Sequence, residues 1–147
     1  MKIRVAEGGD LSRLLELYRE PNELYSSVEV LGKEEAKRRF DEVLADEHQQ
    51  TLVAEEDGRI VGTLVLVVIP NLAHGGAPYS VVENVVVDAP RRGEGKGESL
   101  IREALELARS TGAYKLTLSA NLQRERAHDF YRRLGFRETH LGFEVTL

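Results

Sequence analysis

Residues 85–97 read Val-Val-Val-Asp-Ala-Pro-Arg-Arg-Gly-Glu-Gly-Lys-Gly and decide the fold of this 147-residue chain. They lead from a run of β-branched residues, through a turn rich in glycine, into a stretch with apolar residues at helical spacing. Glycines reach left-handed backbone conformations and let a ligand approach the main chain. The first turn of a helix adds unpaired N–H donors and a positive dipole end. The segment therefore predicts a strand, a phosphate-binding turn and a helix.

Hydrophobic periodicity predicts further elements on both sides of this unit. Asp10 is expected to cap the first helix, and Asp57-Gly58 to form a two-residue hairpin turn. The strand–helix–strand order over 80–119 implies a right-handed parallel crossover. Strands are expected over 2–5, 51–55, 59–68, 80–87 and 114–119, helices over 11–18, 33–49, 95–110 and 124–134, and a closing hairpin over 136–147. The expected fold is α/β (α+β), a single mixed, mostly antiparallel sheet flanked by helices, in one domain over 1–147.

Composition excludes several classes of function. The net charge is −5, so the chain lacks the basic excess that nucleic acid binding requires, whereas a cationic amine suits an acidic surface. There is no cysteine, which rules out disulfides and a cysteine nucleophile, and no His/Asp/Glu cluster has the spacing of a metal site. No membrane span or signal peptide is evident in the sequence, and a cytoplasmic protein is expected.

Two common phosphate-binding motifs do not fit the turn. A P-loop requires Ser or Thr after its Gly-Lys pair, and here Gly97 follows Lys96. A dinucleotide-binding fingerprint requires Gly-x-Gly-x-x-Gly, and the spacing of Gly93, Gly95 and Gly97 differs from it.

The turn instead fits the pattern Arg-x-x-Gly-x-Gly, filled by Arg92, Gly95 and Gly97. A second signature, Phe-Tyr-Arg-Arg-Leu-Gly-Phe, occupies residues 130–136. The two motifs in this order resemble the GNAT superfamily of N-acetyltransferases, and the resemblance covers most of the chain. It implies a GNAT-like acyl-CoA N-acyltransferase fold, acetyl-CoA as co-substrate and a small-molecule amine as acceptor.

The resemblance also assigns the residues that hold acetyl-CoA. Backbone groups of the strand should bond the acetyl carbonyl and the pantetheine arm, and amides of the turn should bind the pyrophosphate. The strands 80–87 and 114–119 are expected to splay apart and open a slot for the thioester. The assigned residues are Val85, Val86, Val87, Arg92, Gly93, Glu94, Gly95, Lys96 and Gly97.

One position departs from the family pattern. Many members carry Asn seven residues before the signature tyrosine, where it contacts the cofactor, and this chain has Arg124 there. Asn121 and Ser119 are nearby substitutes, and the sequence does not choose between them.

Acetylation of an amine needs two proton transfers, one from the amine and one to the departing thiolate. Tyr131 matches the family tyrosine placed near the cofactor sulfur and is the candidate general acid; the alternative is a packing tyrosine in a stripe with Phe130. Glu83 interrupts an apolar strand and is the candidate base, with Val81, Val85 and Val87 expected on its face; the alternative is a structural role, either as the partner of a buried arginine in an ion pair or in a hydrogen bond at the end of the strand. An amide of Val85 or Val86 is the candidate oxyanion donor.

Two histidines are weaker candidates for a proton relay. His74 lies in a Gly/Pro-rich loop and His128 in the last predicted helix, and a solvated role is favoured for both.

The predicted function is direct acetyl transfer from acetyl-CoA to a primary amine of a small molecule. The alternative is a non-catalytic acyl-CoA-binding sensor or regulatory module. The acceptor pocket is expected from residues 20–32, 69–79 and the closing hairpin, so the acceptor itself is not predicted. Homodimers are common in the family, and the oligomeric state is left open.

Overall fold

The computed structural model describes residues 1–19 and 31–147. The strands are β1 (Lys2–Val5), β2 (Gln49–Glu56), β3 (Arg59–Ile69), β4 (Tyr79–Val87) and β5 (Leu116–Leu118). The α-helices are α1 (Leu11–Arg19), α2 (Lys33–Ala45), α3 (Lys96–Ser110) and α4 (Glu125–Arg133). Most of the predicted elements are present.

The chain divides into two compact units, Met1–Thr117 and Leu118–Leu147, and each is described by itself. The expectation of one domain over the whole chain stays a prediction. Among the described residues, no helix has the length and apolar character needed to cross a membrane.

The five strands form one sheet in the order β1-β2-β3-β4-β5. The first four strands pair antiparallel with their neighbours. Next to β4, Tyr114 donates its amide to Pro78 at 3.0 Å, and Ser80 donates its own to Lys115 at 2.9 Å. These bonds advance in the same direction along both segments, as parallel strands require. The mixed, mostly antiparallel sheet is confirmed. Its parallel pair consists of β4, which precedes the glycine-rich turn in the sequence, and β5, which follows it.

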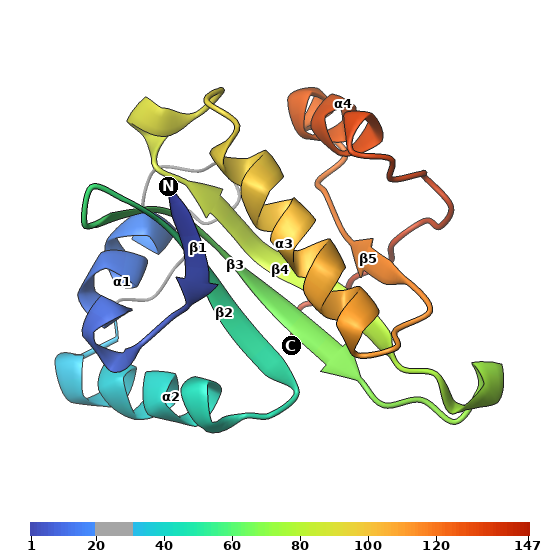
Figure 1. Cartoon of the computed structure of the whole chain (residues 1–147), viewed down its shortest axis with the longest axis horizontal. Coiled ribbons are helices and arrows are strands. Elements are labelled where there is room, and N and C mark those ends of the chain that lie inside the picture. The colour runs from blue at the N-terminus through green and yellow to red at the C-terminus, as the bar shows by residue number, and fades with distance from the viewer. Residues whose placement is uncertain (20–30) are drawn as a thin grey trace. The chain divides into compact units, whose positions relative to one another are not determined.

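Helices cover both faces of the sheet in the first unit. One core joins Leu14 and Leu17 of α1 with Phe40 of α2, Val53 of β2 and Val86 of β4. Residues that alternate with these on the strands face α3, which crosses the other side of the sheet (Figure 1). Four residues of α3 are buried there: Leu100, Ile101, Ala104 and Ala108. Burial on two sides explains the nearly continuous apolar run of β3.

Two turns show how local chemistry sets the element boundaries. Asp57 and Gly58 have φ values of 51° and 73°, which confirms the tight hairpin turn predicted between β2 and β3. Asp10 does not cap α1 as predicted. It ends a 3₁₀ turn that precedes the helix, accepts the amide of Glu7 at 2.8 Å and pairs with Arg4 at 2.7 Å. The Arg4 hydrogen bond lowers the pKa of the Asp10 carboxyl.

Two predicted boundaries were wrong. Helix α2 ends at Ala45 rather than near residue 49, because Asp46 adopts an extended conformation and its carboxylate accepts the amide of His48 at 2.8 Å. The closing hairpin is absent: the structure assigns no strand to the described residues 136–147. The predicted irregular segment 20–32, a proposed part of the acceptor pocket, lies outside the described residues except for Leu31 and Gly32.

The missing hairpin has a physical reason. Four apolar residues alternate along the end of the chain, and all are exposed: Leu141, Phe143, Val145 and Leu147. Alternation favours an extended strand, but a strand is stable only when a partner takes up its backbone hydrogen bonds and an apolar face is covered. The exposed apolar pattern therefore does not stabilise the two arms of the hairpin predicted over 136–147.

Gly62 sets how closely α3 approaches β3. A Cβ at this position would lie 3.1 Å from Leu100 Cδ1 and 3.2 Å from the Val86 carbonyl oxygen. We expect Gly62→Ala to lower the free energy of unfolding by about 1–2 kcal/mol, because the backbone of β4 cannot move aside freely. Urea denaturation measures the loss, with Gly8→Ala as the control, because a Cβ at Gly8 meets nothing within 4 Å. Equal stability of the two variants would contradict this tight contact.

Candidate functional site

The glycine-rich turn (residues 92–97) joins β4 to α3, as the sequence predicts. A 3₁₀ turn over Ala89–Arg91 leaves the strand, and the chain then passes through Gly93 at φ 83° and Gly95 at φ 79°. Gly95 is the N-cap of α3 in the left-handed conformation. Residues with a Cβ rarely adopt these angles, so the glycines are needed for the path of the backbone.

The turn exposes a group of unused N–H donors. Among the residues that the structure describes, none accepts a hydrogen bond from the amides of residues 93–97. Residues 93–95 are exposed. The amide of Arg92, by contrast, donates to the Ala89 carbonyl at 3.4 Å. Five consecutive donors at the positive end of a 15-residue helix fit the oxygens of a pyrophosphate.

Side chains of the turn bind the protein itself. The Arg92 guanidinium donates from Nε to the carbonyl oxygen of Val87 at 3.0 Å, which ties the turn to the end of β4. The Lys96 ammonium lies 2.5 Å from Glu56 Oε1 and its side chain is only 10% exposed. The Lys96 ammonium lies near the turn, and its charge is paired with the carboxylates of Glu56 and, at 3.7 Å, Glu94. Arg92 and Lys96 therefore shape the turn with their side chains.

A β-bulge interrupts β4 just before the turn. Thr63 of β3 faces Val86, whereas Val65 faces Glu83, so Asn84 and Val85 together oppose Leu64. Asn84 has φ 52°, in the left-handed region that Asn tolerates better than most residues. A bulge of this kind bends the strand and re-aims the side chains on either side of it.

The bulge corrects the predicted face of Glu83. Val86 and Glu83 pair with Thr63 and Val65, which point to one side of β3, so Glu83 shares a face with Val86. Val87 pairs with Gly62 and lies on the other side. The expectation that Glu83 and Val87 share a face was therefore wrong. Asn84 within an apolar strand was the signal that could have indicated the bulge.

Glu83 itself is exposed. Within the described parts of the chain it makes no ion pair, so the structural ion pair considered for it is not found there. A solvated carboxylate on the strand that leads to the turn is available to accept a proton.

Tyr131 belongs to the second unit, 118–147, and lies on α4. It is partly buried, and its ring packs edge-on against Phe130 at 5.1 Å and Phe136 at 5.8 Å between centroids. Gly135, at φ 91°, turns the chain back so that the amide of Phe136 donates to the Tyr131 carbonyl at 3.1 Å. The second signature thus folds into one local structure that holds the tyrosine ring.

The weaker candidates have structural partners. His74 is exposed and stacks on Tyr114 with ring centroids 4.2 Å apart. The His128 Nε2 lies 2.8 Å from the Asn121 carbonyl oxygen, and the Asn121 side chain accepts the amide of Gln123 at 2.9 Å. Arg124 is the residue that precedes the first turn of α4. Asn121 thus shapes the start of this helix.

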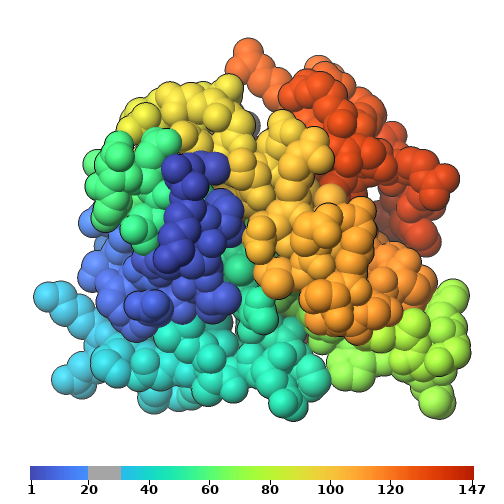
Figure 2. Space-filling view, in the orientation of Figure 1, coloured from blue at the N-terminus to red at the C-terminus, as the bar shows by residue number. Residues whose placement is uncertain are grey.

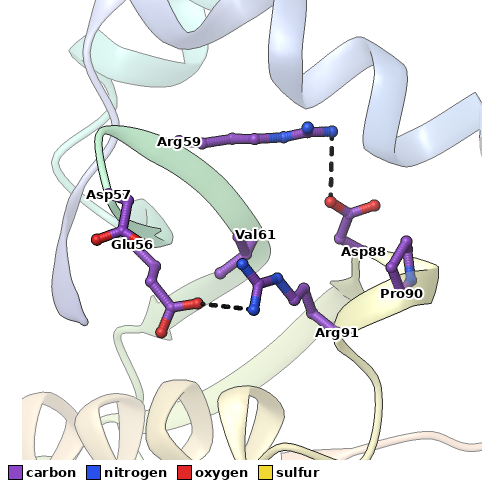
Figure 3. A pocket seen from close by; sticks show the side chains of 7 residues that line it. All are labelled: Glu56, Asp57, Arg59, Val61, Asp88, Pro90 and Arg91. Carbon is purple, nitrogen blue, oxygen red and sulfur yellow. Dashed lines mark ion pairs between the residues drawn. The ribbon is translucent and has the colours of Figure 1, made fainter.

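A cavity of about 260 Å³ lies between the β2–β3 hairpin and the start of the turn (Figure 3). Asp88, its buried acid, lies 2.6 Å from Arg13 Nη2 and 3.5 Å from Arg59 Nη2. On the opposite wall Arg91 lies 3.4 Å from Glu56. Sequence analysis missed these pairs, because Arg13 and Asp88 are 75 residues apart. They fix the position at which β4 passes into the turn.

Gly95→Ala tests the backbone requirement of the turn. A Cβ at Gly95 meets nothing within 4 Å, so its cost comes from the left-handed φ alone, about 1 kcal/mol of unfolding free energy. We also expect a higher KM for acetyl-CoA, because the relaxed backbone would turn the amides away. Gly112→Ala is the matched control: its φ is 77° and it also has open space, but it follows α3. A KM unchanged in Gly95→Ala would argue against a binding role for these amides.

Comparison with known proteins gives a consistent result. Residues 11–136 match the model of the acetyltransferase (GNAT) family. A glucosamine 6-phosphate N-acetyltransferase from Trypanosoma brucei brucei is 36% identical over 139 residues, covering 93% of this chain and 89% of the relative. An aminoalkylphosphonate N-acetyltransferase from Salmonella typhimurium is 34% identical, covering 71% of this chain and 67% of the relative.

The fold comparison agrees. A solved structure from Agrobacterium tumefaciens, assigned as an acetyltransferase, has a TM-score of 0.93 and 36% identity and covers all of both chains. The family match spans both signature motifs, and the TM-score shows that this neighbour has the same fold. The chain belongs to the GNAT family of N-acetyltransferases, enzymes that act on amines with acetyl-CoA as co-substrate.

Proposed function

We propose that this enzyme transfers the acetyl group of acetyl-CoA directly to the primary amine of a small molecule. The observation that carries the proposal is the set of amides at residues 93–97, before and at the start of α3, for which the described part of the chain provides no hydrogen-bond acceptor. An anion with several oxygens satisfies such donors, and the pyrophosphate of acetyl-CoA is one. The strand that leads into the turn supplies the backbone groups of Val85–Val87 for the rest of the co-substrate.

Acetyl-CoA supplies an acetyl group activated as a thioester, and the residues of this chain move the protons. The amine nitrogen forms the new C–N bond as the C–S bond breaks. Glu83 accepts the proton that the amine loses, and the Tyr131 hydroxyl donates a proton to the leaving sulfur. A tyrosine hydroxyl with an ordinary pKa near 10 carries this proton at neutral pH. An amide of Val85 or Val86 stabilises the oxygen that becomes negative.

The acceptor class follows from two kinds of support. The acidic net charge of −5 suits the ammonium group of an acceptor and does not account for an anionic group on it. The two relatives named above act on glucosamine 6-phosphate and on aminoalkylphosphonates, which are small primary amines that also carry a phosphorus oxyanion. We infer that the acceptor of this enzyme belongs to the same chemical class.

Release of free thiol from acetyl-CoA tests the proposal. Wild-type protein is assayed with glucosamine 6-phosphate, unphosphorylated glucosamine, an aminoalkylphosphonate and a peptide with a free N-terminus. We expect amine-dependent thiol release with the phosphorylated or phosphonate amines, and an N-acetylated product by mass spectrometry. Tight acetyl-CoA binding without release for any amine would favour an acyl-CoA-binding module. Failure to bind acetyl-CoA would overturn the assignment of residues 93–97.

A further inference from the structure

One carboxylate, Glu56, links the β2–β3 hairpin to both ends of the glycine-rich turn. It is the last residue of β2, and its Oε1 lies 2.5 Å from the Nζ of Lys96, the first residue of α3. Its Oε2 lies 3.4 Å from Nη1 of Arg91, at the other end of the turn, as Figure 3 shows. The two cations that Glu56 contacts therefore lie just before the turn and near its end, and three of the five residues whose amides find no acceptor in the described structure, 93–95, lie between them.

These groups are shielded from water. The side chains of Lys96 and Glu56 are 10% and 20% exposed, and Glu56 Oε2 is buried without a hydrogen-bond partner among the described residues. The space-filling view shows the green end of the hairpin directly against the yellow segment that carries the turn (Figure 2). The hydrogen bond from Lys96 lowers the pKa of the Glu56 carboxyl, so Glu56 is ionised at neutral pH. A charged pair shielded in this way holds its two side chains in a narrower range of positions than a solvent-exposed pair does.

Electrostatics explain why Lys96 needs this partner. A cation in the first turn of a helix is repelled by the positive end of the helix dipole. Removal of Glu56 would leave the Lys96 ammonium beside the dipole of α3, with the more exposed carboxylate of Glu94, 3.7 Å from Nζ, as its remaining partner among the described residues. The side chain would then swing outward to reach solvent, and the backbone of residues 93–97 would lose one of its fixed ends.

We propose that Glu56 is a positioning residue for the co-substrate: through Lys96 and Arg91 it holds the amides of residues 93–97 in the arrangement that binds pyrophosphate. The proposal rests on the function proposed above. Glu56 is assigned no part in proton transfer, so its loss acts on acetyl-CoA binding and leaves kcat at saturating acetyl-CoA unchanged.

Two single variants separate positioning from simple charge. Glu56→Gln removes a negative charge and Lys96→Met removes a positive one. If the turn is positioned by the pair, both variants raise the Kd for acetyl-CoA by about ten-fold, the loss expected for one charged hydrogen bond. If bulk charge alone mattered, Glu56→Gln would bind the anionic acetyl-CoA more tightly and Lys96→Met more weakly. That opposite pair of shifts would overturn the proposal.

A rescue and a matched control complete the experiment. The double variant Glu56→Lys/Lys96→Glu restores opposite charges between positions 56 and 96 but places an ammonium beside Arg91, so it is expected to bind acetyl-CoA more tightly than either single variant and more weakly than wild type. Glu55→Gln makes the same chemical change one residue earlier, where the carboxylate pairs with Arg4 at 2.7 Å and not with the turn. Its Kd for acetyl-CoA should equal that of wild type. An equal loss in Glu55→Gln would show a general effect of the hairpin and would contradict a specific role for Glu56.

A readout without ligand distinguishes this proposal from the proposed function. In ¹⁵N relaxation measurements on ligand-free protein, we expect the order parameters of the Gly93 and Gly95 amides to fall in Glu56→Gln from about 0.85 toward 0.6. Unchanged order parameters would overturn the positioning role whether or not acetyl-CoA binds. A wild-type protein that fails to bind acetyl-CoA would instead overturn the proposed function, while a fall in order would still support Glu56 as the residue that orders the turn.

Discussion

Tyr131→Phe should lower kcat for acetyl transfer by about 100-fold or more, the usual loss when a general acid is removed. The substitution takes away one hydroxyl and keeps the ring. The edge-on contacts with Phe130 and Phe136 are therefore retained, and the local structure of α4 should not change. Steady-state thiol release at saturating amine and acetyl-CoA measures the effect.

Which kinetic constant changes, kcat or the KM for acetyl-CoA, is as informative as the size of the decrease in kcat. A residue that acts on the leaving sulfur lowers kcat and leaves the KM for acetyl-CoA close to wild type. The basic limb of the pH–kcat profile, which reports loss of the proton on the acid, should also disappear in Tyr131→Phe. A variant with at least half of wild-type kcat would assign Tyr131 to packing, the alternative considered from its sequence pattern.

Asp88→Ala should lower the free energy of unfolding by about 2 kcal/mol, because the shielded Arg13 guanidinium loses its buried carboxylate and keeps only the exposed Glu16, 2.9 Å from its Nη1. The two side chains are 10% and 19% exposed and lie 2.6 Å apart. Arg13 also donates from Nε to the carbonyl oxygen of Ile60 at 3.0 Å, so it cannot turn out to solvent without breaking a second bond. Urea denaturation at pH 7 provides the measurement.

Arg59→Ala is the matched control for this buried pair. Arg59 contacts the same carboxylate, but at 3.5 Å and with 64% of its side chain exposed. Its loss should change the unfolding free energy by less than about 1 kcal/mol, as for other exposed pairs. Similar losses in Asp88→Ala and Arg59→Ala would mean that burial does not decide the strength of these contacts.

The sequence predicts the glycine-rich turn well because the turn is local. Gly93 and Gly95 have the left-handed angles that only glycine adopts readily, and the strand before them and the helix after them follow from periodicity within a few residues. The mixed sheet follows from the hairpin and the crossover. These features are determined by residues that are close to one another in the sequence, so a single sequence is enough to predict them.

Other features depend on residues that meet only after folding. Glu56 and Lys96 are 40 residues apart, and each could equally have been a solvated surface charge. Lys96 is assigned to the ligand through its backbone amide, and the sequence does not indicate that its side chain pairs with Glu56. The closing hairpin predicted over 136–147 shows a different failure, since the described residues of this segment form no strand.

The bulge at Asn84 makes the length of β4 as important as its composition. Ser80 and Val82 are buried at 0% and 2% exposure on one side of the strand, while Glu83 points to the other. Deleting one residue at the bulge would turn the side chains of all β4 residues before it to the opposite face of the sheet. Glu83 would then enter the core and Val82 would leave it. A single-residue gap placed here when homologues are aligned would therefore misassign a catalytic candidate, and a graft of this strand onto another scaffold must include the extra residue.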